Sequence, residues 1–253
     1  MTTVRVGYIP YLNMAPFHRG FGPEPLDRKG IHYEFPVCSP RMLGLEAEHG
    51  RVDAGALSLA DTFRLRSAFE PLGHLGIGVI NGPAQSVLVF SKEPLSELSG
   101  VCAVTDETAT SIRLLQMLLD ERYKRPQVRF GRIASSLMFD GAADALLLIG
   151  NEALQAKADG IPGFPHITDL GEEWYRWKGL PFVFARWMVR QSLDVHVKHE
   201  LLESIEKSLD SVLKEASTKD DEHSLYWRGF AYRLTPEHEQ SAQIFEQWVS
   251  AHV

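Results

Sequence analysis

The sequence predicts an α/β fold, in which short strands alternate with helices along the chain. Three features indicate this fold class. Several segments repeat apolar residues every three or four positions, as amphipathic helices do, and short runs of β-type residues lie between them. Gly and Pro residues separate many of these segments. Because strands that alternate with helices usually pair in parallel, we expect a mostly parallel sheet with helices on both faces.

Turn and cap residues define the elements of the first third of the chain. Pro10 closes the first strand, and Pro40 opens a helix over residues 40–49 that ends at Gly50, since proline suits the first helical position and glycine the position after the last. Ser58 is expected to cap the next helix, with an acidic residue in its first turn. Strands are expected at residues 4–9, 31–37, 52–57, 71–79 and 85–91.

The rest of the chain continues the alternation. Residues 108–123 carry a stripe of Ile and Leu at helical spacing, and the chain is helical again from Asp194 until a break near residues 217–222. The charge run 219–222 is interpreted as a solvated turn, and Thr235-Pro236 opens a final helix. Further strands are expected at residues 100–105, 128–130, 144–149, 166–170 and 181–189.

The composition excludes several kinds of partner. The 253 residues include 26 Lys and Arg against 33 Asp and Glu, which gives a net charge of −7. A protein that binds the phosphate backbone relies on clustered basic residues, so we expect no nucleic acid partner. No apolar run is long enough for a transmembrane helix, and no secretory signal is visible, so we expect no membrane partner and a cytoplasmic location. The length permits two ordinary domains or one large α/β unit.

Common catalytic templates are absent from the sequence. The residues after the first strand match neither the dinucleotide nor the phosphate-loop spacing, and there is no Gly-x-Ser-x-Gly motif. His196 and His199 are three positions apart on a predicted helix. This spacing alone is weak evidence for a metal site, and two exposed surface histidines are the favoured interpretation. Cys38 is interpreted as a buried small side chain. His18 is the one histidine considered for catalysis, with packing or solvent exposure as the alternative.

Polar residues at the ends of predicted elements are the candidate ligand contacts. In α/β sheets ligands collect at the carboxyl ends of the strands, and helix starts bind carboxylates well. Each candidate also has a plain structural alternative: a cap, a core side chain, strand surface or, for the arginine, a solvated charge. The candidates are Tyr11, Asn13, Arg41, Ser86, Thr110, Ser111 and Asn151.

Motifs around these residues resemble, in the same order, those of the chorismate dehydratase family of the futalosine route to menaquinone. They are Gly7-Tyr8-Ile9-Pro10-Tyr11-Leu12-Asn13 with Pro16, Val52-Asp53, Ser86-Val87 with Ser91, Thr110-Ser111, residues 144–150, 169–174 and 179–185. The sister naphthoate-forming enzyme has a Pro-Asn-Asp-Thr-Phe type motif near its start, where this chain has Tyr11-Leu12-Asn13. The chain departs from the family's usual residues at Pro10, Met14, Asn151 and Lys178.

The resemblance implies a periplasmic-binding-protein-like fold of type II, with two α/β lobes joined by two hinge crossings. We expect the first lobe at residues 1–88 plus 186–253 and the second at residues 89–185. The implied reaction is loss of water from chorismate to give 3-[(1-carboxyvinyl)oxy]benzoate. It needs no metal or organic cofactor, and chorismate, a small carboxylate, is the implied partner.

In this interpretation Asn13 is catalytic, because a side-chain amide both donates and accepts hydrogen bonds without changing charge near neutral pH. The expected substrate-binding residues are Tyr11, Arg41, Ser86, Thr110, Ser111 and Asn151. The alternatives are a non-catalytic small-anion-binding protein of the same fold and the sister 1,4-dihydroxy-6-naphthoate synthase.

Overall fold

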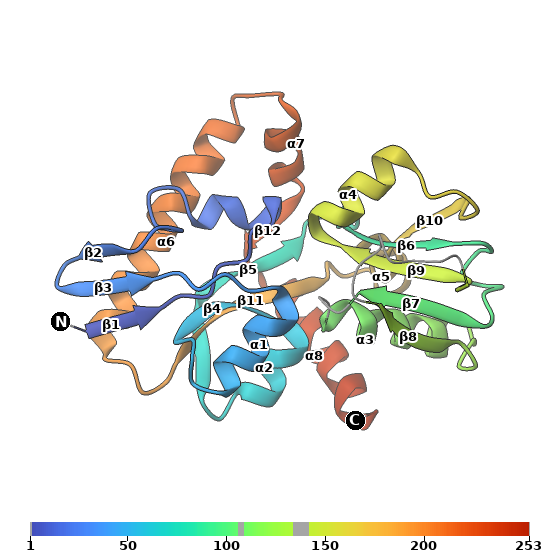
Figure 1. Ribbon diagram of the computed structural model, residues 1–253, viewed down its shortest axis with the longest axis horizontal. Helices are drawn as coiled ribbons and strands as arrows, with labels where there is room; N and C mark the ends of the chain where they lie inside the picture. Colours follow the sequence, from blue (N-terminus) through green and yellow to red (C-terminus); the bar gives the residue numbers. More distant parts are fainter. Residues whose placement is uncertain (1, 106–108, 134–141, 253) are drawn as a thin grey trace. The chain divides into compact units, whose positions relative to one another are not determined.

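The computed structural model describes residues 2–105, 109–133 and 142–252, and the chain divides into two compact units (Figure 1). Unit 1 contains Met1–Gly78 and Val183–Pro236, and unit 2 contains Val79–Phe182 and Glu237–Val253. The chain therefore passes between the units three times, at residues 78–79, 182–183 and 236–237, rather than the expected two.

The first sheet of unit 1 is built around the amino-terminal strand. β3 pairs in parallel with β1 and antiparallel with β2, in the order β1-β3-β2. Beyond β1, isolated parallel bridges join Val6 to Ala54 and Tyr8 to Val37, so the extended segment after β1 continues beside its neighbours. The elements of this part are β1 (Thr2–Arg5), the 3-10 helix η1 (Leu12–Phe17), β2 (Leu26–Arg28), β3 (Ile31–Glu34) and α1 (Pro40–Glu48).

The second sheet of unit 1 has the order β12-β5-β11-β4, with β11 antiparallel to both β4 and β5. Every residue of β4 is buried although β4 ends this order, because the segment after β1 pairs with its free edge, where the Gly7 amide donates to the Ala54 carbonyl at 2.8 Å. The elements are β4 (Ala54–Ser58), α2 (Leu59–Leu65), β5 (Phe69–Val79), β11 (Val183–Arg190), α6 (Val195–Ala216), α7 (Glu222–Arg228) and β12 (Phe230–Arg233).

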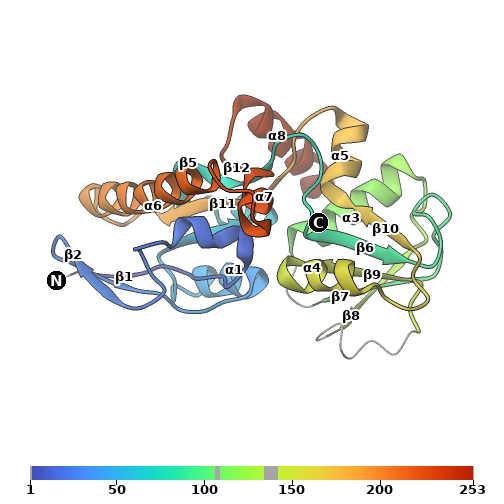
Figure 2. The ribbon, with the colours of Figure 1, turned by 90° about the horizontal axis from the view of Figure 1, so that it is seen from above.

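Unit 2 contains one five-stranded sheet of order β10-β6-β9-β7-β8, whose strands are labelled in Figure 2. β6 is antiparallel to β9 and β10, whereas β7 is parallel to β8 and β9, so β6 alone runs in the reverse direction. The strands are β6 (Val87–Ser91), β7 (Val101–Thr105), β8 (Arg129–Ile133), β9 (Ala145–Ile149) and β10 (His166–Asp169).

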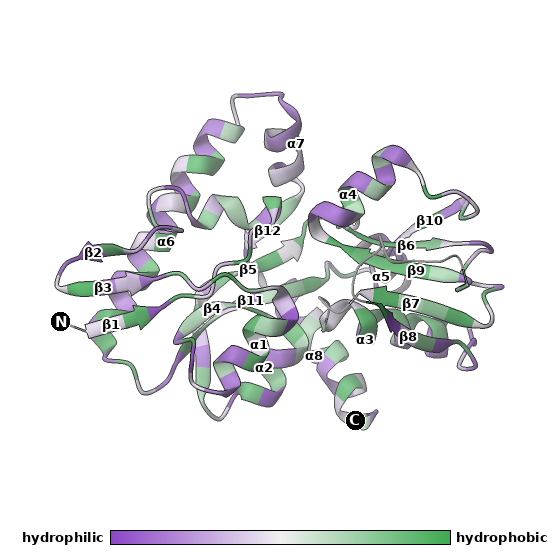
Figure 3. Cartoon of the chain, viewed as in Figure 1, coloured by the Kyte–Doolittle hydropathy of each residue, from purple (hydrophilic) through white to green (hydrophobic). Residues whose placement is uncertain are grey.

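The helices of unit 2 bury an apolar sheet whose central strands are green in Figure 3. One face carries Leu88, Phe90, Leu146 and Leu148, which pack with Ala153 of α4. The helices are α3 (Thr110–Met117), the π-helical turn η2 (Leu118–Arg122), α4 (Gly150–Asp159), α5 (Leu170–Lys178) and α8 (Pro236–Ala251).

The structure differs from the expected sheet in the direction of its strands. Parallel and antiparallel pairs occur in both units, where a mostly parallel sheet was expected. The reason is that β3 follows β2 without a helix between them, while β6 and β11 each enter their sheet from the other unit. A strand that follows another without a crossover helix does not have to run in the same direction.

The last helix also differs from the expected domain division. α8 packs in unit 2, where the Phe245 ring lies 5.2 Å from the Phe182 ring and 6.5 Å from the Trp174 ring. The expected division placed residues 237–253 with the first lobe. This aromatic contact instead buries the apolar stripe of α8 against unit 2.

Candidate functional site

The predicted contacts of unit 2 gather at one edge of its sheet. Ser86 directly precedes β6, and Asn151 lies two residues after the end of β9, the antiparallel partner of β6. Thr110 and Ser111 begin α3, the helix after β7, which runs parallel to β9. Since β6 runs the opposite way, its amino end and the carboxyl ends of β7 and β9 meet at the same edge. The sheet thus brings all four residues to the edge where such sheets bind ligands.

The four residues differ in exposure. Ser86, Thr110 and Ser111 are at most 5% exposed, whereas Asn151 is exposed at the start of α4. Neither α3 nor α4 has a side-chain cap at its first turn, so the cap alternative for the hydroxyls of Thr110 and Ser111 is not supported by the structure. Thr108, the first residue of the helix expected over residues 108–123, lies outside the described residues.

The predicted contacts of unit 1 likewise lie at one edge of that unit. Tyr8 bridges Val37 in parallel, and the Cys38 amide donates to the Tyr8 carbonyl at 2.9 Å. The helix η1 begins shortly after the segment of Tyr8, and α1 begins shortly after the segment of Val37 and Cys38. Tyr11, Asn13 and Arg41 stand at these two turns, so the pairing brings them to a common edge.

Asn13 has a buried acceptor that the protein does not use. Its side-chain Oδ1 is inaccessible to solvent and accepts no hydrogen bond from any residue that the structure describes. A buried carbonyl oxygen without a donor costs about 1–3 kcal/mol, so such groups usually have a partner. Asn13 is therefore not a helix cap, the structural alternative for this residue, and its oxygen is suited to a donor from a ligand.

Arg41 is a half-buried cation at the first turn of α1. Ser39 caps this helix by accepting from the Met42 amide at 3.4 Å. Among the residues of the described ranges, no carboxylate pairs with the Arg41 guanidinium. By contrast, Arg5 of the same unit forms a two-bond pair with Asp53, at 2.9 Å for both bonds. An arginine without an internal partner is suited to an external anion.

Two carboxy-terminal side chains hold η1 in place. The Trp227 Nε1–H group donates to the Leu12 carbonyl at 2.8 Å, and the Ser208 hydroxyl donates to the Pro16 carbonyl at 2.9 Å. These bonds lie on either side of Asn13 in the sequence. Sequence reasoning missed both residues because each acts on a segment about two hundred positions away, and no local pattern signals such a contact.

The sequence pattern of a known family matches residues 4–251, almost the whole chain, and its description is menaquinone biosynthesis. The chain belongs to the menaquinone biosynthesis family. A protein of Thermus thermophilus named chorismate dehydratase is 33% identical over 202 residues, which are 74% of this chain and 69% of the relative.

The fold of this chain is shown by its similarity to solved structures. The protein AF1704 from Archaeoglobus fulgidus aligns over 99% of this chain and 97% of its own, with a TM-score of 0.74 and 17% identity. The periplasmic aliphatic sulphonate binding protein SsuA from Escherichia coli aligns over 98% and 92%, with a TM-score of 0.59 and 11% identity. The expected periplasmic-binding-protein-like α/β fold is confirmed.

His18 of this menaquinone biosynthesis protein is packed in an aromatic cluster. Its ring lies 4.8 Å from that of Tyr8 and 6.0 Å from that of Trp187, and its Nδ1–H group donates to the Phe21 carbonyl at 3.3 Å. Burial lowers the pKa of His18 to about 4, so the ring is neutral near pH 7. Packing, the alternative considered for this residue, describes its position.

The other singled-out groups are structural. Cys38 is buried, and desolvation raises the pKa of its thiol, which disfavours the reactive thiolate. His196 and His199 are exposed, and no group of three or more His, Cys, Asp and Glu side chains placed to hold a metal occurs in the described part of the chain. Nor does any described helix have the length and apolar character needed to cross a membrane.

Proposed function

We propose that this protein is a chorismate dehydratase, which removes water from chorismate to give 3-[(1-carboxyvinyl)oxy]benzoate. The observation that carries the proposal is the 33% identity to the Thermus thermophilus protein of that name. The unused acceptor on Asn13, within the motif most specific to the resembled family, supports it. The reaction belongs to menaquinone biosynthesis, with the cytoplasm as its proposed location.

The chemistry suits a site of amides and hydroxyls. Loss of a ring proton and the neighbouring hydroxyl makes the ring aromatic, so the product supplies much of the driving force. The protein has mainly to orient the ring and to hold two carboxylates. Because the protein has a net charge of −7, its overall electrostatic field repels the dianionic substrate, and local groups must attract the substrate instead.

Asn13 is proposed to hold the departing hydroxyl. Its unused Oδ1 is an acceptor and therefore needs a donor. Chorismate with both carboxylates ionised has one O–H group and no other polar donor, so the hydroxyl is the group that Oδ1 can accept from. This bond orients the C–O bond that breaks.

The remaining residues are proposed to bind the carboxylates. Arg41 supplies the charge, and its planar guanidinium forms two parallel bonds to a carboxylate. Ser86, Thr110 and Ser111 supply hydroxyls at the sheet edge of unit 2, and the first amides of α3 and α4 point toward an anion placed there. Tyr11 and Asn151 complete the proposed substrate contacts.

The direct test is to incubate the purified full chain with chorismate and to follow the benzoate product by mass and by aromatic absorbance. We expect conversion that depends on the protein and stops when chorismate is exhausted. A chorismate-dependent rise in melting temperature without product would contradict the proposal and favour the anion-binding alternative. A naphthoate product from the sister substrate would favour the sister enzyme.

A further inference from the structure

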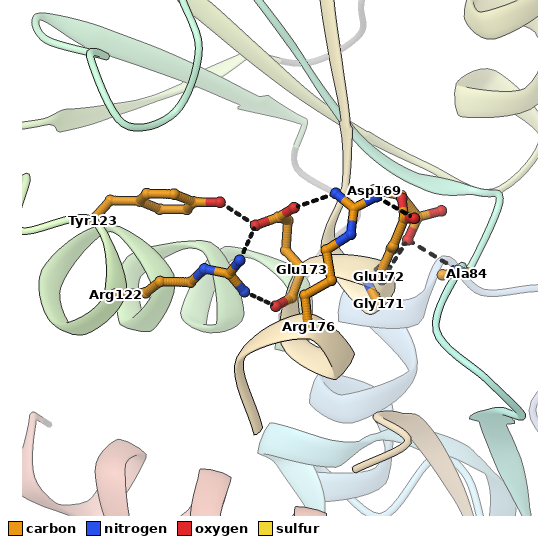
Figure 4. A network of polar contacts seen from close by, with 8 residues as sticks. All are labelled: Ala84, Arg122, Tyr123, Asp169, Gly171, Glu172, Glu173 and Arg176. Carbon is orange, nitrogen blue, oxygen red and sulfur yellow. Dashed lines mark hydrogen bonds and ion pairs between the residues drawn. The ribbon is translucent and has the colours of Figure 1, made fainter. Parts of the chain in front are cut away.

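Asp169 binds the loop that leads to Ser86. It stands at the end of β10, where its carboxylate caps α5 by accepting from the Gly171 amide at 2.9 Å and from the Glu172 amide at 3.1 Å. The same carboxylate also accepts from the Ala84 amide at 2.9 Å through Oδ1 and from the Gln85 amide at 2.7 Å through Oδ2. One side chain therefore joins a helix start to the loop before β6 (Figure 4).

The bound loop has a backbone that needs such support. Gln85 has φ of 62°, in the left-handed region that residues with a Cβ rarely adopt. α5 also approaches the loop closely, because a Cβ on Gly171 would lie 2.6 Å from the Gly82 carbonyl oxygen. Substitution of Gly171 would push the loop and the helix apart. The Asp169 bonds offset the cost of the Gln85 conformation.

The loop fixes Ser86 on both sides. The Ser86 amide donates to the Ala84 carbonyl at 2.7 Å, and the Ser86 carbonyl accepts from the Gly150 amide at 2.8 Å. Gly150 begins α4, so the Asp169-bound loop and the start of α4 hold Ser86 between them. This places the Ser86 backbone at the edge where the other candidate contacts of unit 2 lie.

Asp169 itself stands on a firmly held helix. Glu173, 6% exposed, accepts from the Tyr123 hydroxyl and from Arg176 at 3.1 Å, and pairs with Arg122 at 3.2 Å. These contacts attach the first turns of α5 to η2 (Figure 4). Because these contacts hold the start of α5, the Asp169 carboxylate can fix the loop relative to that helix.

We propose that Asp169 is a positioning residue for Ser86: its carboxylate holds the left-handed turn at Gln85 and thereby sets where the Ser86 hydroxyl meets the substrate. The inference rests on the proposed function for the role of Ser86. Asp169 does not contact the substrate in this proposal.

Asp169→Asn separates the loop contact from the helix cap. Asparagine caps helices about as well as aspartate, so its Oδ1 keeps the bonds to α5. Its Nδ2 group, however, would face the Gln85 amide, donor against donor, where Oδ2 now accepts. Asp169→Ser is the second variant, because serine also caps well and its single oxygen replaces the two of the carboxylate.

Asp144→Asn is the matched control. Asp144 belongs to the same unit and also accepts from a backbone amide, that of Val101, at 3.0 Å, as well as from Lys92 at 3.3 Å. It directly precedes β9 and so lies at the opposite end of that strand from Gly150. A general effect of removing a carboxylate from unit 2 would appear in both variants.

The first readout is amide hydrogen exchange of the full chain. In both Asp169 variants we expect the Gln85 amide to exchange about ten- to hundredfold faster than in the wild type, as the loss of a bond to a charged acceptor implies. In Asp144→Asn the rate at Gln85 should stay within about twofold. Unchanged exchange at Gln85 in the Asp169 variants would overturn the proposal.

The second readout is a double-mutant cycle with Ser86→Ala on chorismate turnover. If Asp169 acts through Ser86, Asp169→Asn lowers kcat about tenfold or more in the wild type and less than about threefold in the Ser86→Ala protein. If the kcat loss of the double variant equals the product of the losses of the two single variants, the positioning role is wrong. A wild type that does not convert chorismate would instead contradict the proposed function, and the exchange rates would still decide whether Asp169 holds the loop.

Discussion

Asn13 and Arg41 are candidate contacts whose polar groups are not paired within the described part of unit 1. Each offers hydrogen-bonding capacity that no described residue of the protein uses: a buried acceptor on Asn13 and a charged donor set on Arg41. Most neighbouring charges of unit 1 are paired, as in the contacts between Arg64 and Asp61 and between Arg5 and Asp53. Unsatisfied groups cost stability, and a ligand that pairs with these two would remove that cost.

Asn13→Ala should remove activity without loss of stability. A transition-state contact of this kind contributes about 2.7–4 kcal/mol, so kcat should fall by roughly a hundred- to thousandfold. Because the buried oxygen has no partner, its removal should leave the melting temperature equal or slightly higher. Turnover of chorismate and a thermal melt measure the two effects. Near-normal turnover would exclude the catalytic role, and a large drop in melting temperature would restore a structural one.

Arg41→Ala should weaken substrate binding rather than folding. Loss of charged hydrogen bonds to a carboxylate costs about 1.5–3 kcal/mol, and calorimetric titration with chorismate would measure it. Arg28→Ala is the control, since Arg28 ends β2 and pairs with Ile31, at the opposite end of β3 from the segment that leads to Arg41. If both variants bind chorismate as the wild type does, Arg41 is only a solvated surface charge.

His18 should make the protein sensitive to mild acid. Burial lowers the pKa of His18 to about 4, below the value of an unfolded chain, so the unfolded state binds the proton more readily. The contribution of neutral His18 is complete above about pH 6.5 and is lost as pH falls toward 4, by about 3 kcal/mol in total. Urea unfolding at several pH values should therefore show a shallower acid loss in His18→Phe than in the wild type or in exposed His196→Gln. Parallel curves for all three proteins would contradict this.

At the scale of elements, the sequence predicted the helix boundaries that neighbouring Pro and Gly residues determine. The helix opened by Pro40 and ended at Gly50 is present within one residue of the expected range, and Gly50 has φ of 72°. The strand directions and the short elements α7 and β12 were not predicted, because antiparallel return and packing depend on contacts distant in the sequence. The run 219–222 is exposed as expected, yet Asp221 also caps α7 by accepting from the Ser224 amide at 2.9 Å.

In the candidate site, too, features set by neighbouring residues were predicted and those set by distant contacts were not. Residues at element ends were found from the sequence because caps and strand ends have recognisable patterns. Ser58 shows the limit of such patterns: it precedes α2 as expected, but its hydroxyl donates to Asp61 at 2.6 Å instead of accepting from the backbone. The contacts that hold the candidate site residues, from Trp227 and from Asp169, come from other parts of the fold and have no local signature.

Trp227→Phe should test how α7 supports the Asn13 turn. Phenylalanine keeps most of the aromatic packing but loses the Nε1–H bond to the Leu12 carbonyl. We expect a stability loss of only about 0.5–1.5 kcal/mol and a fall in kcat larger than the change in KM, because η1 would be less well fixed. Ser208→Ala removes the second η1 contact and should act in the same direction. A stability loss with unchanged kcat would show that the bond only supports folding.

At the scale of the molecule, each unit is assembled from segments far apart in the sequence. β11 of unit 1 pairs with β4 and β5 after the chain has passed through unit 2, and α8 returns to unit 2 from unit 1. The expectation of two crossings followed the resembled fold, whereas the third crossing is set by where the apolar face of α8 is buried. No sequence pattern states which of two apolar surfaces a terminal helix will cover.

Phe245→Ala tests that placement of α8. The Phe245 ring is fully buried against the contacting rings of Trp174 and Phe182, so its loss should destabilise unit 2 by about 3–5 kcal/mol. Val195→Ala, at a position that is 79% exposed in unit 1, should change stability by less than about 0.5 kcal/mol. Hydrogen exchange during urea unfolding reports each unit separately. Amides of β6 and β9 should lose protection at lower urea in Phe245→Ala, before those of β4. If β4 lost protection first instead, α8 would stabilise unit 1, as the resemblance implies.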